Sequence, residues 1–375
     1  MKIVAQGTVN TGVAGTARAM ATFASFVPLD DGTWLAGYRV GSTKDSDDEK
    51  IEFRRSIDEG VTWSKPELPF TAPTMDGASG TIRCAYCTDM GGGRLIVAAM
   101  WIDHTTYPGK PLFNEETEGC LPMKILIADS EDDGKSWSEF RQVHYPEDIG
   151  PPSLTNPIIR LPSGRLVLSV ETNKNYLDTS KWLQRVVYSY SEDGGQTWGP
   201  PITTCQDPTA RIFYWDQRAA VWPDGRLATF SWTYDRETTK YLNIQRRISS
   251  DEGATWSDTE DLGITDQASH PAVLSDGRVV FAWVDRFQSR SIRARAANGI
   301  DSPFTAESEV VLYQQEEDTG SAEGGGDTGE LLSEMGLWTF GLPYTAALPN
   351  GDAVVVYYQG TNTRMDCCWA RLAVS

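Results

Sequence analysis

Long apolar runs are absent from this chain of 375 residues. No run approaches the ~18 residues of a membrane-spanning helix, and residues 1–6 contain no signal-peptide core. We therefore expect a protein without a membrane partner, located in the cytoplasm or secreted after removal of a signal peptide.

An excess of positive charge is also missing. The 52 Asp and Glu residues outnumber the 33 Lys and Arg residues, and the formal net charge is −19. Nucleic acids and anionic membrane surfaces are bound through clustered positive charge. The composition therefore argues against nucleic acid and membranes as partners.

The six cysteines lack the spacing of a metal site or a disulfide framework. Cys84 and Cys87 are separated by two residues, but they lie in a predicted strand, where their side chains point to opposite faces. No second pair of this spacing accompanies them, and Cys367 and Cys368 are adjacent. We expect buried free thiols in a reducing compartment, with no metal and no cofactor.

The chain does contain an eight-residue motif, Ser-Xaa-Asp-Xaa-Gly-Xaa-Thr/Ser-Trp, in four copies. The copies span residues 56–63, 130–137, 191–198 and 249–256, and each follows a strand-like run. The motif predicts a hairpin turn in which the Asp side chain accepts hydrogen bonds from backbone N–H groups and the Gly takes a positive φ. The Trp is expected to pack under the neighbouring strands. Four copies indicate an array of similar supersecondary units.

Six turns that end in glycine interleave with these Asp motifs. Each is followed by strand-forming residues, and they lie at residues 31–32, 92–93, 163–164, 224–225, 276–277 and 350–351. Asp-Gly, Ser-Gly and Asn-Gly between apolar runs are hairpin signals. Six such turns against four Asp motifs indicate six four-stranded units, of which two lack the Asp motif.

We therefore predict an all-β, single-domain protein over residues 1–375, a six-bladed β-propeller of four-stranded antiparallel blades. The blades are expected at roughly 17–70, 81–144, 155–204, 211–262, 269–313 and 337–375. The last blade shows only three strands. The lone N-terminal strand, residues 1–9, is expected to be its fourth, because an open sheet edge invites aggregation and a ring must close.

Two segments interrupt this pattern. A long insertion, residues 104–120, separates the second and third strands of the second blade. A stretch rich in Glu and Gly, residues 314–336, is expected to be a loop.

Functional residues are expected on one face of the propeller. The glycine turns and the Asp motifs are the first and third turns of each meander, so they share the other face. The longer loops around the pore on the opposite face then carry binding and catalysis. There, Arg forks can bind carboxylates, and aromatic faces can stack on sugar rings. The candidate substrate-binding residues are Arg39, Arg83, Arg218, Arg236, His270, Arg290 and Trp215.

With its four Asp motifs and six repeats, the chain resembles the sialidase superfamily of Asp-box propellers over nearly its whole length. The resemblance implies glycoside hydrolysis by an acid/base Asp in the first-blade loop and a Tyr nucleophile assisted by a Glu, with three Arg on the substrate carboxylate. Asp45 matches the acid/base Asp. Its pKa must then be raised by burial or by its acidic neighbours, because an ordinary Asp is a poor acid at neutral pH.

Other positions match the family only in part. Asp216 falls where the family has its Glu, whereas Leu342 occupies the position of the nucleophile. Tyr344 lies two residues further on, on the same strand face, and is the candidate substitute. The first-blade Arg of the family aligns with Thr22, and only the fifth-blade Arg, near Arg290, is kept. The three-arginine clamp of sialidases is therefore not evident.

Three hypotheses about function follow. The first is a glycosidase, exo-acting on an acidic or deoxy sugar, with Asp45 as general acid/base and Asp216 or Tyr344 opposite it. The second is a lectin-like propeller without catalysis, and a related carbohydrate-active lyase is a variant of the first. The third is an interaction scaffold. The collection of Asp, His, Tyr and Arg around one pore favours an enzyme whose partner is a glycan or a small acidic sugar, while the oligomeric state stays open.

Overall fold

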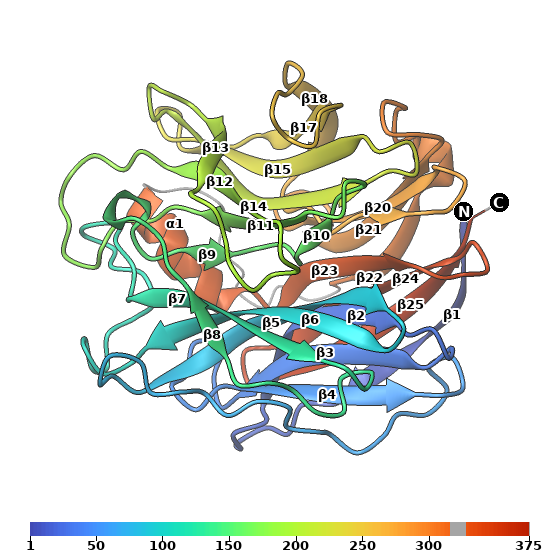
Figure 1. Ribbon diagram of the computed structural model, residues 1–375, viewed down its shortest axis with the longest axis horizontal. Helices are drawn as coiled ribbons and strands as arrows, with labels where there is room; N and C mark the ends of the chain where they lie inside the picture. The colour runs from blue at the N-terminus through green and yellow to red at the C-terminus, as the bar shows by residue number, and fades with distance from the viewer. Residues whose placement is uncertain (316–327, 375) are drawn as a thin grey trace.

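The computed structural model describes residues 1–315 and 328–374, and these form an all-β propeller (Figure 1). Five hydrogen-bonded sheets contain all the strands of these residues. The largest sheet has seven strands in the order β23 (Phe340–Ala347), β24 (Ala353–Thr361), β25 (Arg364–Ala373), β2 (Met20–Pro28), β3 (Trp34–Gly41) and β4 (Lys50–Ser56), with β1 (Lys2–Asn10) beside β25.

The other four sheets follow one another along the chain. The second sheet contains β5 (Gly80–Gly91), β6 (Arg94–Asp103), β7 (Met123–Ser130) and β8 (Arg141–Val143). The third contains β10 (Ile159–Arg160), β11 (Leu166–Glu171), β12 (Arg185–Ser191) and β13 (Ile202–Gln206), with β9 (Ser153–Leu154) on β11. The fourth contains β14 (Ile212–Val221), β15 (Leu227–Asp235), β17 (Asn243–Ser249) and β18 (Glu260–Thr265), with β16 (Lys240–Tyr241) on β15. The fifth contains β19 (Ala272–Val273), β20 (Val279–Asp285), β21 (Ser291–Ala297) and β22 (Val310–Gln314).

The expected division into six separate four-stranded sheets is wrong, because the described residues form five sheets, only two of which have four strands. The reason lies where the chain closes on itself. β2 and β25 pair in parallel through a single residue pair, Met20 and Met365, and this contact merges the first and last repeats into one sheet.

The predicted closure by the N-terminal strand is confirmed. β1 pairs with β25 in antiparallel fashion, from Lys2 opposite Ala373 to Asn10 opposite Cys367. Figure 1 accordingly shows the two termini side by side. An otherwise open edge of the last repeat is thereby covered.

The four Asp motifs fold as predicted and with the same hydrogen bonds in each copy. In the third copy the Gly195 N–H donates to the Ser191 hydroxyl at 2.8 Å, and the Thr197 N–H donates to Asp193 Oδ1 at 2.9 Å. The Thr197 hydroxyl donates to Asp193 Oδ2 at 2.6 Å, and Gly195 has φ 87°. These bonds pair the Ser and Asp side chains of the motif with backbone groups two to four residues away.

The two turn series lie on one face, as expected. The Asp133 N–H, in the second Asp motif, donates to the carbonyl of Gly93 in a glycine turn at 2.8 Å. Glu252, in the fourth Asp motif, accepts from the Ser163 N–H of another glycine turn at 2.9 Å. The longer loops, including residues 104–122 between β6 and β7, therefore belong to the opposite face.

The middle strands of the sheets are buried on both faces. Every residue of β3, β15 and β20 is buried, which explains their nearly continuous apolar sequences. All six cysteines are buried and free, and Cys84 and Cys87 belong to different core clusters, as opposite strand faces require. No helix in residues 1–315 and 328–374 is long and apolar enough to cross a membrane.

The segment expected to be a loop, residues 314–336, is only partly described, since residues 316–327 lie outside the described part of the chain. The expectation is wrong for the remainder, because Thr328–Glu334 form the helix α1 and Met335–Leu337 form a 3-10 turn. Leu331 and Leu332 of α1 are buried, so this segment packs against the propeller. Two further 3-10 turns lie at Glu147–Ile149 and Ala306–Ser308.

Candidate active site

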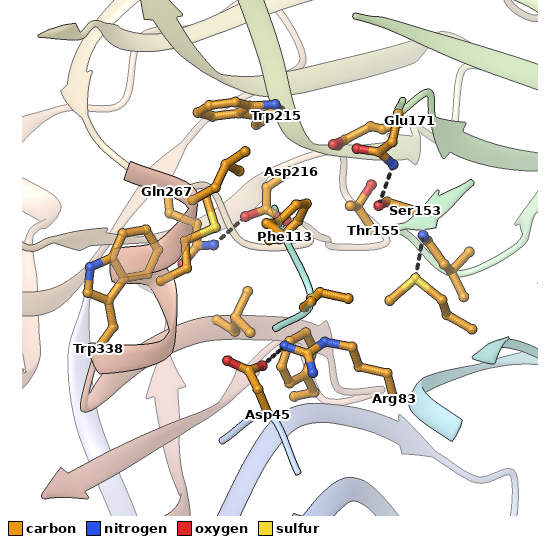
Figure 2. A pocket seen from close by; sticks show the side chains of 18 of the residues that line it. Asp45, Arg83, Phe113, Ser153, Thr155, Glu171, Trp215, Asp216, Gln267 and Trp338 are labelled. Atoms are coloured by element: carbon orange, nitrogen blue, oxygen red, sulfur yellow. Dashed lines mark hydrogen bonds and ion pairs between the residues drawn. The ribbon is translucent and has the colours of Figure 1, made fainter. Parts of the chain in front are cut away.

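A cavity of about 170 Å³ lies on the face away from the Asp motifs. Strands of four sheets contribute to its walls, together with Gln267 and Arg286, which flank strands of the fifth sheet. The insertion after β6 and the helix α1 also contribute residues. Figure 2 shows Asp45 and Arg83 on one side of this cavity and Asp216, Glu171 and Trp215 on the other. The cavity thus gathers side chains that are far apart in the sequence.

Three of the inner strands direct a side chain into the cavity by the same backbone device. Phe23, Asp216 and Leu342 all line the cavity and have positive φ, at 52°, 47° and 43°. Each lies at a register shift in its strand: β2, β14 and β23. Left-handed non-glycine residues cost of order 1–3 kcal/mol each and concentrate at functional sites. Their recurrence at matching bulges indicates that these strands are shaped to present a side chain to the pocket.

Asp45 is fixed by an ion pair with Arg83. Arg83 also donates to buried Glu49 at 3.0 Å, and Glu49 in turn accepts from Arg39 at 2.8 Å. Burial of the Asp45 carboxyl would raise its pKa, but the charges of Arg83, Arg39 and Lys44 outweigh burial and lower this pKa to about 2. The expectation of a raised pKa for Asp45 is therefore wrong: its acidic neighbour Glu49 is already neutralised by the arginines.

Asp216 projects from the bulge of β14 toward the middle of the cavity (Figure 2). One carboxylate oxygen accepts a hydrogen bond from the Gln267 side chain. The other lies 3.5 Å from Nη2 of Arg218, which is 2 % exposed. These contacts fix the carboxylate while leaving it at the surface of the cavity.

Glu171, the last residue of β11, is a third carboxyl group in the cavity wall. It is 6 % exposed, and Oε1 accepts a hydrogen bond from the Gln217 N–H at 3.0 Å. Burial and then the negative charge of Asp216 raise the pKa of Glu171 to about 8, against the smaller opposing effects of that hydrogen bond and of Arg218. Among the described residues Glu171 forms no ion pair within 4.0 Å. The raised pKa of Glu171 thus favours the protonated carboxyl group at neutral pH, in contrast to Asp45.

Tryptophan side chains and the segment that follows α1 enclose the cavity. Trp215, Trp232 and Trp338 line it, and the indole N–H groups of Trp232 and Trp338 are buried without a partner among the described residues. The Lys44 ammonium donates to the carbonyl of Trp338 at 2.9 Å and so ties the segment after α1 to the first-blade loop. Indole faces beside free N–H donors suit a ligand with both C–H faces and oxygen acceptors, as sugars have.

No family model matches this chain, and no curated protein matches it. Solved structures do. A protein of unknown function from Dyadobacter fermentans is 19% identical, matches over 100% of both chains and has a TM-score of 0.73. The intramolecular trans-sialidase from Ruminococcus gnavus, solved with oseltamivir carboxylate, is 13% identical over 98% of this chain and 97% of its own, with a TM-score of 0.66. The alpha-L-arabinanase from Penicillium chrysogenum, solved with arabinobiose, is 16% identical over 99% of this chain and 98% of its own, with a TM-score of 0.64.

At these identities the comparisons show the fold alone. This chain has a sialidase-like propeller fold, which a trans-sialidase, an arabinanase and a protein of unknown function share. Since one architecture carries several chemistries, function has to be argued from the pocket of this chain.

Of the residues predicted from the sequence, five lie together in the cavity wall. They are Asp45, Asp216, Arg83, Arg218 and Trp215. They come from three sheets and were grouped only by their expected position at the pore.

The other five predicted residues lie elsewhere. Arg39 is 1 % exposed and lies behind the cavity wall, where it pairs with Glu49. Arg236 pairs with Glu118 at a separate surface hollow between the insertion and α1. Arg290 follows β20, and its backbone carbonyl accepts a hydrogen bond from the Gln315 N–H at 2.9 Å, away from the cavity. Arg236 and Arg290 lie outside the strands, as expected, whereas Arg39 lies within β3, and none of the three lines the cavity.

Tyr344 and His270 are also outside the cavity. Their rings stack 4.8 Å apart and lie in a hollow toward the other end of the pore. Burial raises the pKa of the Tyr344 phenol and lowers that of His270 to about 3. The bulge at Leu342 directs Leu342, and not Tyr344, to the cavity, so the structure does not bring Tyr344 together with Asp216. The substitution of Tyr344 for the missing nucleophile stays a prediction.

Several residues of the wall were not among the selected site residues. Lys44, Glu171, Arg286 and Trp338 fall on the loop-rich face that the sequence predicts, whereas Phe23 and Gln267 were not placed there. For Glu171 a signal existed, because a carboxylate ends the apolar run of β11 on the loop-rich face. For Phe23 the signal was hidden, because the bulge moves the pocket-facing position one residue beyond Thr22.

A metal centre finds no support in the described part of the chain. No three His, Cys, Asp or Glu side chains among residues 1–315 and 328–374 are grouped to hold a metal ion.

Proposed function

We propose that this protein is a glycoside hydrolase of the sialidase-like propeller type, and that it acts on a terminal sugar unit. The observation that carries the proposal is the cavity itself, where several carboxyl groups face one another between tryptophan side chains. Paired carboxyl groups flanking a bound sugar are the usual apparatus of glycoside hydrolysis. The sialidase-like fold agrees with this reading but does not decide it.

The size and charge of the cavity support a small acidic sugar as the substrate. At about 170 Å³ it is smaller than the ~300–1,000 Å³ of pockets for drug-sized ligands, so one sugar ring suits it better than an oligosaccharide. Nε of Arg218 is buried without a hydrogen-bond partner among the described residues. Arg83 and Arg218 would contact the acidic group, and Trp215 would contact the ring.

The proposed roles of the carboxylates follow from their partners. Asp216, oriented by Gln267 and Arg218, is the carboxylate that meets the anomeric carbon. Asp45 is the acid/base group that the sialidase resemblance implies, and this role stays a prediction. Its low pKa makes it a poor proton donor, because the ion pair with Arg83 favours the carboxylate.

We also propose that residues 1–375 act as one domain and that the seven-stranded sheet corresponds to two blades, which would give six in all. The single parallel residue pair between β2 and β25 supports this division.

A panel of aryl glycosides tests the function. It should include sialosides, uronides and deoxy-sugars, with release of the aglycone as the measurement. We expect one acidic member to be cleaved and Asp216→Asn to abolish the cleavage without changing the thermal melt. A protein that binds a panel sugar without cleaving it would support the lectin alternative, and an unsaturated product would support the lyase alternative.

A further inference from the structure

The buried carboxyl group of Glu171 has no role in the mechanism that the sialidase resemblance implies. Its place in the cavity wall, its lack of a cationic partner within ion-pair distance among the described residues, and its neighbour Asp216 call for an explanation. From these contacts we infer that Glu171, and not Asp45, is the proton donor to the leaving group in the reaction proposed above. The inference rests on that proposed function and deepens it.

Burial without a counter-charge favours the neutral acid. Glu171 is 6 % exposed, and one oxygen is occupied by the Gln217 N–H. A buried carboxylate without a cation is costly, whereas a neutral carboxyl group is not. The charged groups that act on it are Asp216, which opposes ionisation, and Arg218, which favours ionisation; both come from β14.

Asp45 has the opposite surroundings. Its carboxylate forms an ion pair with Arg83, and the charges of Arg39 and Lys44 act on it as well. These cations keep it ionised throughout the neutral range, so it has no proton to give. Two carboxyl groups whose surroundings push their pKa values apart divide the acid and base roles between them.

The proposed step balances within the pocket. The Glu171 carboxyl group transfers its proton to the glycosidic oxygen as the bond from that oxygen to the anomeric carbon breaks. An Asp216 oxygen bonds to the anomeric carbon in its place. Water then displaces Asp216 and passes its proton to the Glu171 carboxylate, which restores both groups. Asp45 remains a carboxylate that positions Arg83.

Leaving-group dependence separates the two candidate donors. General acid catalysis contributes typically 10²–10⁴-fold, and a leaving group that departs without protonation does not need it. We expect Glu171→Gln to lose ~10²–10⁴-fold in kcat/KM on alkyl or phenyl glycosides, but far less on dinitrophenyl glycosides, and to lose the basic limb of the pH profile. Asp45→Asn is expected to keep the leaving-group dependence of the wild type. The reverse pattern in these two variants would overturn the inference and return the role to Asp45.

The protonation state can be measured without turnover. A carboxyl group whose pKa is raised by folding, here from 4.5 to about 8, stabilises the fold below the lower value, and this stability is lost as pH rises through the higher one. The midpoint of urea unfolding of the wild type should therefore fall relative to that of Glu171→Gln as pH rises through this range. Glu147→Gln, an exposed site, is the control and should show no such difference.

The two measurements keep the proposals distinct. If no panel glycoside is cleaved, the proposed function fails, while the unfolding comparison still reports whether Glu171 holds a proton. If the wild type cleaves a glycoside but the unfolding difference is flat with pH, Glu171 is ionised and the inference fails alone.

Discussion

The two faces of this propeller are built by different kinds of contact. On the face of the Asp motifs, each turn is closed by hydrogen bonds between residues two to four apart, as between Ser56 and Asp58 and between Ser56 and Gly60. On the opposite face, contacts join residues far apart in sequence. Asp45 pairs with Arg83, Gln267 donates to Asp216, and Lys44 donates to Trp338 across 294 residues.

The difference explains why the turns repeat while the pocket does not. A turn that satisfies its own polar groups needs only its own eight residues, so the same sequence recurs wherever the turn is needed. A pocket residue depends on the residue that faces it from another sheet. The sequence of that face is therefore free to vary from one repeat to the next, and this variation carries the chemistry.

Removing the strand that closes the ring should disturb both faces at once and have the largest effect. Deletion of residues 1–9 exposes the edge of β25, which β1 covers along its length. We expect aggregation or loss of a cooperative thermal transition. Val4→Ser is the control, since Val4 is 46% exposed on the same strand. A truncated protein that melts like the wild type would contradict closure by β1.

Removing a buried charge behind the pocket should have the second-largest effect. Arg39→Met leaves Arg83 as the one cation within 4.0 Å of Glu49 among residues 1–315 and 328–374. Loss of one partner of a buried pair costs ~3–5 kcal/mol. We expect the free energy of unfolding, measured in urea, to fall by about 3 kcal/mol. This is the low end of the range, because Arg83 still pairs with Glu49. Arg94→Met, which breaks the exposed pair with Glu131, should cost no more than ~1 kcal/mol. If Arg39→Met left the stability unchanged but weakened sugar binding, Arg39 would be a substrate-binding residue after all.

Substitutions in a single Asp-motif turn should lower stability without changing turnover at the pocket. Ser191→Ala leaves the Gly195 N–H without its acceptor and should cost about 1–3 kcal/mol of unfolding free energy. Asp193→Ala should also lower the melting temperature, since the carboxylate accepts two backbone N–H groups. Turnover per folded molecule should stay at the wild-type level in both variants. Selective loss of turnover with an unchanged melt would place the turn in the active site.

The smallest effect is expected just beyond the pocket. Tyr344→Phe removes a phenol that burial keeps protonated and that lies outside the cavity wall. Turnover on any cleaved glycoside should be unchanged within error, and the melt should change little. A large loss of turnover with an intact fold would restore Tyr344 as the nucleophile and reject the assignment of Asp216.

The sequence predicted the strands, the turns and the closing strand well, because strand-forming runs and turn residues act locally. It placed Asp45 and Asp216 at the pore, and both line the cavity, while their roles stay predictions. It did not predict that Tyr344 lies outside the cavity wall, because no residue pattern marked the bulge that directs Leu342 inward. It also assigned Asp45 a raised pKa. The correct direction could not be predicted without knowing that Arg83, from another sheet, forms an ion pair with Asp45.

What the amino-acid sequence determined by itself is the repeating frame, because each Asp motif and each glycine turn satisfies its own hydrogen bonds within a few residues. The tertiary structure alone decided the rest: the merging of the first and last repeats, the left-handed bulges that direct Asp216 inward, and the opposite protonation of Asp45 and Glu171. A pKa depends on the charges and the burial that the neighbours of a group impose. For Asp45 and Glu171 those neighbours come largely from other strands and sheets, so only the folded ring brings them into place.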